Sequence, residues 1–133
     1  MEVKYNLADK RAYLRVYLQV VDCMSSLQTT DSEKEVLIDF LLLPEQYRPF
    51  MFSALAKNKV LESYTERGET MSMINLNNKI YSLINKKFLV REVDDTIVMR
   101  NAILQGAIRL LKALENGKSC QIIFDFNKDE QKF

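Results

Sequence analysis

The sequence predicts a mainly helical α+β domain with a small antiparallel sheet, and three observations support this fold class. Among 133 residues only three are Gly and two are Pro, so few positions interrupt a helix. Apolar residues recur at every third or fourth position in several segments, which is typical of amphipathic helices. Residues 88–99, in contrast, are rich in β-branched and aromatic side chains, which predicts strands.

The length of the chain predicts one domain, because 133 residues fall near the commonest domain size. Within residues 1–133 we distinguish an N-terminal helix region, 1–31, and a core, 32–100. A C-terminal part, 101–133, contains a helix, a strand and a short polar tail. Four to five helices are expected in total.

Two helices are expected in the first third of the chain. The first covers residues 8–27. Its apolar face comprises Tyr13, Leu14, Tyr17, Leu18, Val21 and Met24. The second begins at about Ser32, because Thr30 with Glu33 and Ser32 with Glu35 have the spacing of capping boxes.

Two prolines bound the next segment. Pro44 ends the second helix, and Pro49 fits the first turn of a third, where a missing amide costs nothing. The residues of the third helix that we expect to be buried are Phe50, Ala54, Leu55, Val60, Leu61 and Tyr64. The spacing leaves open whether residues 50–64 form one helix or two.

A fourth helix is expected to begin between Ser72 and Leu76 and to run to the hairpin. Its buried residues are Leu76, Ile80, Leu83 and Ile84. The helix is followed without a breaker by the strands of the hairpin. A helix that enters a hairpin directly is a compact unit for presenting one surface to a partner.

The hairpin and the elements after it complete the expected fold. Asp94 and Asp95 form a two-residue turn within 88–99, because Asp tolerates left-handed backbone geometry. A further helix is expected after the hairpin, with Asn101 as its cap. Residues 119–126 alternate between apolar and polar side chains, which predicts a strand. We expect this last strand to extend the small sheet.

The residue types argue against catalysis. His is absent, which removes the usual general base at neutral pH and the commonest zinc ligand. There is no Gly-rich phosphate loop and no Cys-x-x-Cys pair, and the two cysteines, Cys23 and Cys120, lie on apolar faces without the spacing of a structural disulfide. We therefore expect no enzyme, no metal, no cofactor and no small-molecule substrate.

The hydropathy of the chain argues against a membrane-spanning segment and a signal peptide. No apolar stretch approaches the ~20 residues that span a bilayer, and the residues after Met1 do not have the pattern of a signal peptide. We expect a protein that is not membrane-bound and is not secreted by a signal peptide.

The fourth helix carries the candidate interface. The residues that we expect to face a partner are Asn77, Asn78, Tyr81, Ser82, Asn85 and Lys86. If the partner is DNA, Asn pairs with adenine in the major groove, and Lys79, Lys87 and Arg91 contact phosphates. Together with Lys86, these three cations give residues 70–91 a local charge of +4, since the segment has no acid.

Charge elsewhere favours a protein partner. Glu92, Asp94 and Asp95 place three negative charges at the hairpin tip, where phosphates would be repelled. The whole chain has 19 basic and 18 acidic residues, whereas DNA-binding domains are usually basic. Both alternatives, a protein partner and DNA, stay open from the residues alone.

The C-terminal strand is a second candidate surface. If it does not pair with the hairpin, its apolar residues form an edge that can add to a neighbour's sheet. These residues are Ile122, Ile123, Phe124 and Phe126.

The segment LNNKIYSLINKKFLVREVDDTIVMR, preceded by a capped helix, resembles the winged-helix superfamily over residues 32–100. In the multiple-antibiotic-resistance regulator family the corresponding stretch is the recognition helix and the wing. The resemblance implies a winged helix-turn-helix scaffold. The chain, rich in Asn, Lys and Ile, is also similar to small proteins of tailed phages.

The sequence therefore predicts a non-enzymatic structural or interaction protein: a connector- or ring-type subunit of a tailed-phage virion on a winged-helix-like scaffold. Its partner is expected to be protein, in a homo-oligomer or larger assembly, in the virion or in the cytoplasm of a bacterial host. The alternative is a sequence-specific DNA-binding transcriptional regulator of the winged helix-turn-helix type.

Overall fold

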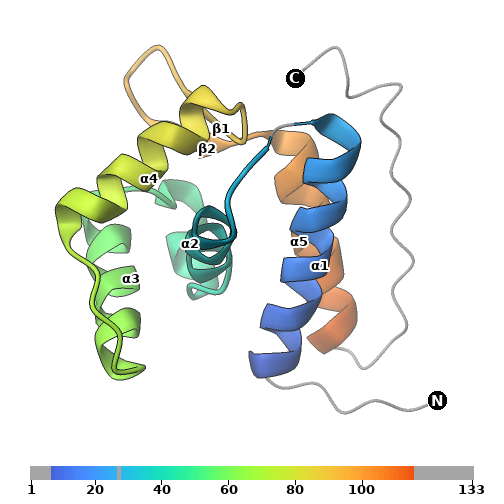
Figure 1. Ribbon diagram of the computed structural model, residues 1–133, viewed down its shortest axis with the longest axis horizontal. Coiled ribbons are helices and arrows are strands. Elements are labelled where there is room, and N and C mark those ends of the chain that lie inside the picture. Colours follow the sequence, from blue (N-terminus) through green and yellow to red (C-terminus); the bar gives the residue numbers. More distant parts are fainter. Residues whose placement is uncertain (1–6, 27, 116–133) are drawn as a thin grey trace. The chain divides into compact units, whose positions relative to one another are not determined.

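The computed structural model describes residues 7–26 and 28–115 (Figure 1). These residues form six helices and one antiparallel hairpin, which confirms the mainly helical α+β class but exceeds the four to five helices expected, because η1 is a separate element. The elements are α1 (Leu7–Ser25), α2 (Asp31–Leu41), the 3-10 helix η1 (Glu45–Phe50), α3 (Ala54–Glu66), α4 (Met73–Asn85), β1 (Leu89–Arg91), β2 (Ile97–Met99) and α5 (Asn101–Glu115). The predicted strand 119–126, Cys120 and the polar tail lie outside the described residues. None of the helices in the described ranges is long and apolar enough to cross a membrane.

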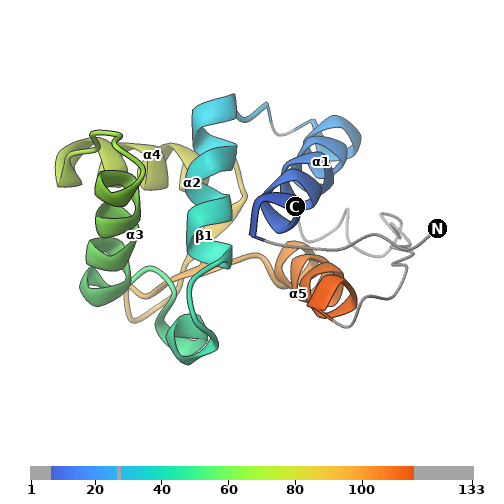
Figure 2. The same cartoon turned by 90° about the horizontal axis from the view of Figure 1, so that it is seen from below.

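The described residues divide into two compact units. In one unit α1 packs against α5, and the two helices lie side by side in both Figure 1 and Figure 2. The buried residues of this pair are Leu14, Tyr17, Leu18, Val21, Ile103, Ala107, Leu110, Leu111 and Leu114. Tyr13 and Met24, which we expected on the buried face of α1, are 40% and 51% exposed, so that part of the prediction is wrong.

A glycine of α5 makes room for a tyrosine of α1. The Tyr17 hydroxyl donates a 2.8 Å hydrogen bond to the Ile103 carbonyl. A Cβ at Gly106 would lie 2.2 Å from that hydroxyl oxygen and 2.8 Å from the ring carbon that bears it. The absence of a side chain at Gly106 therefore lets the two helices pack around Tyr17.

Replacing Gly106 by alanine should lower the free energy of unfolding by about 1 to 3 kcal/mol, because the added methyl group displaces a buried ring. In an unobstructed helix interior the same change would raise stability by about 1 kcal/mol. Thermal or urea unfolding measures the difference. In a background with Tyr17→Leu the penalty should disappear, and a penalty that persists there would contradict the explanation.

The other unit covers residues 29–100 and contains α2, η1, α3, α4 and the hairpin. In it α2 packs against both α3 and α4, and α4 packs against β1. The ring centroids of Phe40 and Phe52 lie 4.6 Å apart in its interior. Its buried apolar residues also include Val36, Leu37, Ile38, Leu41, Ala56, Val60, Leu76, Ile80, Leu83, Phe88, Leu89 and Met99.

Helix α2 begins one residue before the predicted start and has the predicted cap. Thr30 accepts from the Glu33 amide at 3.2 Å, and the Glu33 carboxylate accepts from the Thr30 amide at 2.8 Å, so the capping box is confirmed. Ser32 lies inside the helix and is not its cap. The helix ends at Leu41, ahead of Pro44, as predicted.

The third predicted helix is two elements. Residues 45–50 form η1, with Pro49 inside it, and α3 starts only at Ala54 after its cap, Ser53. This later start leaves Phe50 at 41% and Leu55 at 57% exposure, and Ala54 is also exposed, so three of the expected buried residues are wrong, while Leu61 is partly buried. Val60 and Tyr64 are buried as expected, together with Ala56.

The hairpin lies within the predicted range, with a different turn. Arg91 pairs with Ile97, and the Glu92 amide donates to the Thr96 carbonyl at 2.7 Å. Three residues, not two, therefore connect the last hydrogen-bonded pair. Asp95 takes φ = 68°, the left-handed geometry that closes such three-residue loops.

Candidate functional site

One face of α4 is exposed along its whole length. Ile74, Asn78, Tyr81 and Asn85 are all exposed, at spacings of three and four residues, so they share one side of the helix. We call these four residues the outer stripe. Asn75 is exposed beside it. The opposite side of α4 carries the buried Leu76, Ile80 and Leu83.

The outer stripe contains no charge and one large aliphatic side chain. Ile74 is 73% exposed and Tyr81 is 50% exposed. The helix is capped by Ser72, which accepts from the Asn75 amide at 3.1 Å, so Ile74 lies in the first turn. An amide-rich stripe with apolar groups can hydrogen-bond and pack, but it offers no acid or base.

Two lysines of α4 are tied to the first turn of α2. Lys79 Nζ lies 2.9 Å from the Ser32 hydroxyl oxygen, and Lys86 Nζ lies 2.6 Å from a carboxylate oxygen of Glu33. The Glu33 side chain is 5% exposed, so its ion pair with Lys86 is buried on the acid side. These contacts turn both ammonium groups away from the outer stripe.

Glu33 is a strongly perturbed acid. Burial alone would raise the pKa of Glu33, but hydrogen bonds from Lys86, Ser82 and Thr30 outweigh it and lower the pKa to about 2. The carboxylate is therefore ionised throughout the physiological range. It joins the start of α2 to the end of α4.

The predicted partner-facing residues of α4 divide into two groups. Asn78, Tyr81 and Asn85 are exposed, as expected. Asn77, Ser82 and Lys86 are only partly exposed. Each of these side chains has a polar group directed toward the protein. The Asn77 Oδ1 atom is buried. The Ser82 hydroxyl donates a hydrogen bond to Glu33, and Lys86 forms the ion pair with Glu33 described above.

Sequence reasoning missed two residues, Ile74 and Asn75. It allowed α4 to begin as late as Leu76, whereas the helix begins at Met73. The signal that identifies the earlier start is Ser72, whose hydroxyl caps the helix.

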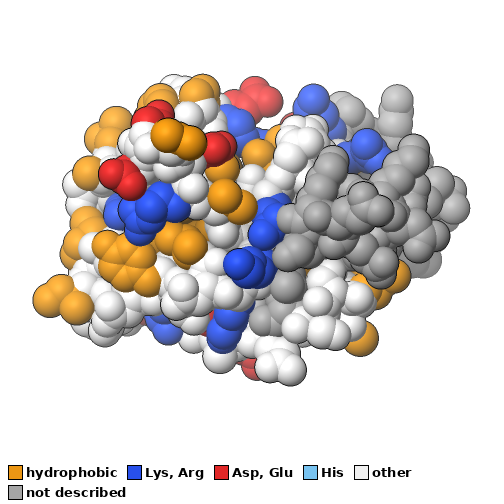
Figure 3. Space-filling model, turned by 90° about the horizontal axis from the view of Figure 1, so that it is seen from above, with side chains coloured by type: hydrophobic (Ala, Val, Ile, Leu, Met, Phe, Trp, Pro, Cys, Tyr) orange, Lys and Arg blue, Asp and Glu red, His pale blue; other side chains and the backbone are white. Residues whose placement is uncertain are grey.

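One cation contacts the outer stripe, and a second interacts electrostatically with the first. The Arg91 guanidinium lies 5.8 Å from the centre of the Tyr81 ring, a cation–π distance. Burial and then the positive charge of Arg91 lower the pKa of Lys57, so these two cations are close enough to repel each other. Among the described residues no carboxylate forms an ion pair with either cation. Figure 3 looks onto the side that carries α4 and the hairpin, and shows basic side chains beside apolar ones there.

A third cation follows the helix. Lys87 has φ = 74°, and the Lys87 and Phe88 amides donate to the Ile84 and Leu83 carbonyls at 3.1 Å each, which is a Schellman motif. The same motif ends α3 with Gly68 at the equivalent position, φ = 75°. A lysine is strained where glycine is not, and its exposed side chain extends from the end of α4.

The remaining phosphate candidate, Lys79, is the one bound to Ser32. The acids of the hairpin tip, Glu92, Asp94 and Asp95, are all exposed, as the sequence led us to expect. Arg91, the last residue of β1, lies directly before this acidic tip, whereas Lys87 precedes the hairpin at its other end.

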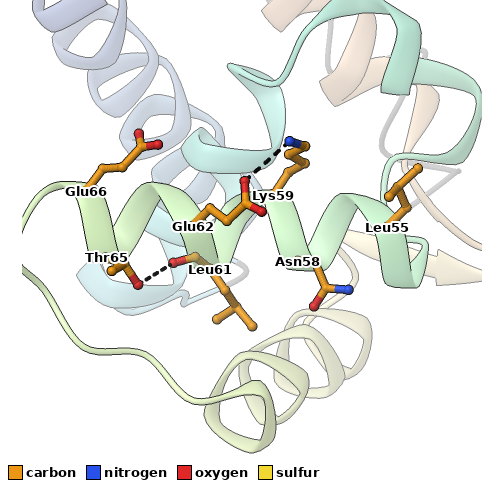
Figure 4. A pocket seen from close by; sticks show the side chains of 7 residues that line it. All are labelled: Leu55, Asn58, Lys59, Leu61, Glu62, Thr65 and Glu66. Atoms are coloured by element: carbon orange, nitrogen blue, oxygen red, sulfur yellow. Dashed lines mark hydrogen bonds and ion pairs between the residues drawn. The ribbon is translucent and has the colours of Figure 1, made fainter.

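A hollow along α3 is the other surface feature. Figure 4 shows its lining, which comes from this helix alone: Leu55, Asn58, Lys59, Leu61, Glu62, Thr65 and Glu66. Lys59 pairs with Glu62 at 3.3 Å, and Thr65 donates to the Leu61 carbonyl at 3.2 Å, so several of its polar groups already have partners. The hollow is open and shallow, which does not suit an enclosed small ligand.

Within the described ranges no cluster of three or more His, Cys, Asp or Glu residues has the arrangement of a metal site. The predicted strand edge, Ile122 to Phe126, lies outside those ranges. Comparisons of the chain with protein-family models, with curated proteins and with solved structures gave no match.

Proposed function

We propose that residues 29–100 form a winged helix-turn-helix that binds duplex DNA, with α4 as the recognition helix in the major groove. In this proposal α3 and α4 are the helix-turn-helix pair, and the β1–β2 hairpin is the wing. The protein acts through binding and without catalysis or cofactor. Of the two functions expected from the sequence, we therefore propose DNA binding in preference to a role as a virion subunit.

The observation that carries the proposal is the composition of the α4 face and its border. The outer stripe offers amide groups that can bond base edges, Arg91 lies over the Tyr81 ring of the stripe, and Lys87 follows the end of α4 as an exposed cation. The charge of Arg91 reaches Lys57 on α3, and no acid of the described residues forms an ion pair with either, so a phosphate bound at Arg91 would also attract Lys57.

The acidic hairpin tip determines which part of the wing would contact DNA. Phosphates repel Glu92, Asp94 and Asp95, so the wing would contact DNA through Arg91, the last residue of β1 before the tip, which lies beside Tyr81. The tip would point away from the duplex.

Fluorescence anisotropy with labelled duplexes tests the proposal. Binding should weaken steeply between roughly 50 and 200 mM salt, because each phosphate contact releases counterions. The double variant Lys57→Ala, Arg91→Ala should reduce the salt slope by about 2, one for each lost contact. Lys59→Ala, which removes an exposed cation of α3 paired with Glu62, is the matched control and should leave the slope unchanged.

The virion-subunit hypothesis predicts the opposite results. A subunit of a particle should show no salt-dependent duplex binding and should bury more than about 1,000 Å² against its neighbours. Light scattering would detect large assemblies. Failure to bind any duplex would overturn the DNA-binding proposal.

A substitution at Lys87 should affect the stability of the protein and its DNA affinity in opposite directions. Replacing Lys87 by glycine should raise the free energy of unfolding by roughly 0.5 to 1 kcal/mol, because glycine adopts φ = 74° without strain. The same variant should bind DNA more weakly, with a salt slope lower by about 1. Urea unfolding and anisotropy on one protein sample check both. Unchanged binding would remove Lys87 from the interface.

A further inference from the structure

We propose that α4 selects A·T base pairs, through its amide side chains and Ile74, and does not select guanine. This inference rests on the proposed DNA binding and concerns which bases the helix recognises. It follows from which side chains of α4 reach outward and which do not.

The side chains suited to guanine are held away from the groove. Lys or Arg is the usual partner of the guanine O6 and N7 acceptors. Lys86 is bound to the buried Glu33 carboxylate at 2.6 Å, and releasing it would leave that charge without its closest partner. Lys79 is directed to Ser32 at 2.9 Å. Neither lysine belongs to the outer stripe.

The side chains that do reach outward match adenine. Asn78 lies in the middle of the outer stripe, and Asn75 is exposed one turn nearer the start of the helix. A carboxamide can accept from adenine N6 and donate to N7 at once, a pairing that no other base allows in the major groove. The first turns of a recognition helix are the part that approaches base edges.

Ile74 matches thymine. It is 73% exposed in the first turn of α4, where a large aliphatic side chain gains nothing from the protein's own core. The C5-methyl group of thymine is the apolar group that the major groove offers. Ile74 next to Asn75, and Asn78 one turn further on, thus presents an apolar contact beside two amides, as an A·T pair requires.

Selection from a randomised pool of duplexes of about 20 base pairs, two turns of DNA, tests the inference. The enriched sequences should share A·T pairs at two or more neighbouring positions. A shared G·C motif, or binding without enrichment, would overturn the inference and leave the proposed function intact. If no duplex is retained, the proposed function fails.

Base analogues in the enriched duplex then assign the contacts. Replacing the selected adenines by 7-deazaadenine should weaken binding at least about 5-fold for the native protein and cause no further loss for Asn78→Ala. Replacing thymine by uracil should weaken binding about 4-fold, the value of one buried methyl group, and should not affect Ile74→Ala. Asn58→Ala, an exposed amide on α3, should keep both sensitivities. The inference would be contradicted if Asn78→Ala were still weakened by 7-deazaadenine, or if Ile74→Ala were still weakened by uracil.

Discussion

Replacing Arg67 by alanine is expected to lower the free energy of unfolding by about 3 to 5 kcal/mol, the largest effect that we predict. Arg67 follows α3, and its guanidinium donates to both carboxylate oxygens of Asp39 on α2, at 3.0 and 3.3 Å. The Asp39 side chain is 2% exposed. Without Arg67 a buried negative charge loses its cation, and α2 loses this tie to the end of α3.

The surroundings of this pair strengthen the expectation. The Arg67 guanidinium lies 4.5 Å from the centre of the Tyr64 ring. Burial, followed by the charge of Asp39 and a hydrogen bond to it, raises the pKa of the Tyr64 hydroxyl. Removing the arginine therefore disturbs two packed groups at once, the Asp39 carboxylate and the Tyr64 ring.

The reverse substitution should cost less. Asp39→Ala leaves an arginine whose side chain is 34% exposed and can be hydrated, whereas Arg67→Ala leaves a buried acid. Glu69→Gln is the matched control, because Glu69 also pairs with Arg67, at 3.3 Å, but is 58% exposed. It should change stability by less than about 1 kcal/mol. Equal losses for Arg67→Ala and Glu69→Gln in urea unfolding would refute the argument.

The second large effect is expected at Glu33. Its pKa is lowered from 4.5 to about 2 in the folded protein. A difference of this size is worth about 3 kcal/mol, since each pKa unit corresponds to ~1.4 kcal/mol. Glu33→Gln should therefore lower the free energy of unfolding at neutral pH by about 3 kcal/mol.

The same group predicts a pH dependence. Because the folded-state pKa of Glu33 lies below the unfolded value, its contribution is complete above pH 4.5 and is lost as pH falls towards about 2. Urea unfolding across that range should show a steeper loss of stability for the native protein than for Glu33→Gln. Asp31→Asn, in the same first turn but exposed, is the control and should keep the native slope. Parallel pH curves for the native protein and Glu33→Gln would contradict the prediction.

Local sequence signals predicted the parts of the fold that depend on neighbouring residues. Thr30 with Glu33 caps α2, because a hydroxyl can satisfy an amide two or three residues later, and α4 begins at Met73, within the expected range of 72–76. Pro44 ends α2 for an equally local reason. The hairpin falls within 88–99, although Asp95 closes a three-residue loop.

Contacts between distant parts of the chain were not predictable in the same way. Lys86 and Ser82 looked outward from helical spacing alone, but both meet Glu33, some fifty positions earlier in the chain. Phe50 and Leu55 were expected to be buried because nothing in the spacing identified η1 as a separate 3-10 helix. The candidate site was accordingly predicted along its exposed centre, at Asn78, Tyr81 and Asn85, and missed at its edges.

The contacts from Ser32 and Glu33 to Lys79 and Lys86, together with the buried Leu76, Ile80 and Leu83, hold α4 in its rotation about its own axis. The outer stripe takes no part in this. Its residues are consequently exchangeable: a library that varies Ile74, Asn78, Tyr81 and Asn85 should yield mostly folded members of near-native stability. A scaffold that separates orientation from recognition in this way is suited to being reprogrammed for new targets.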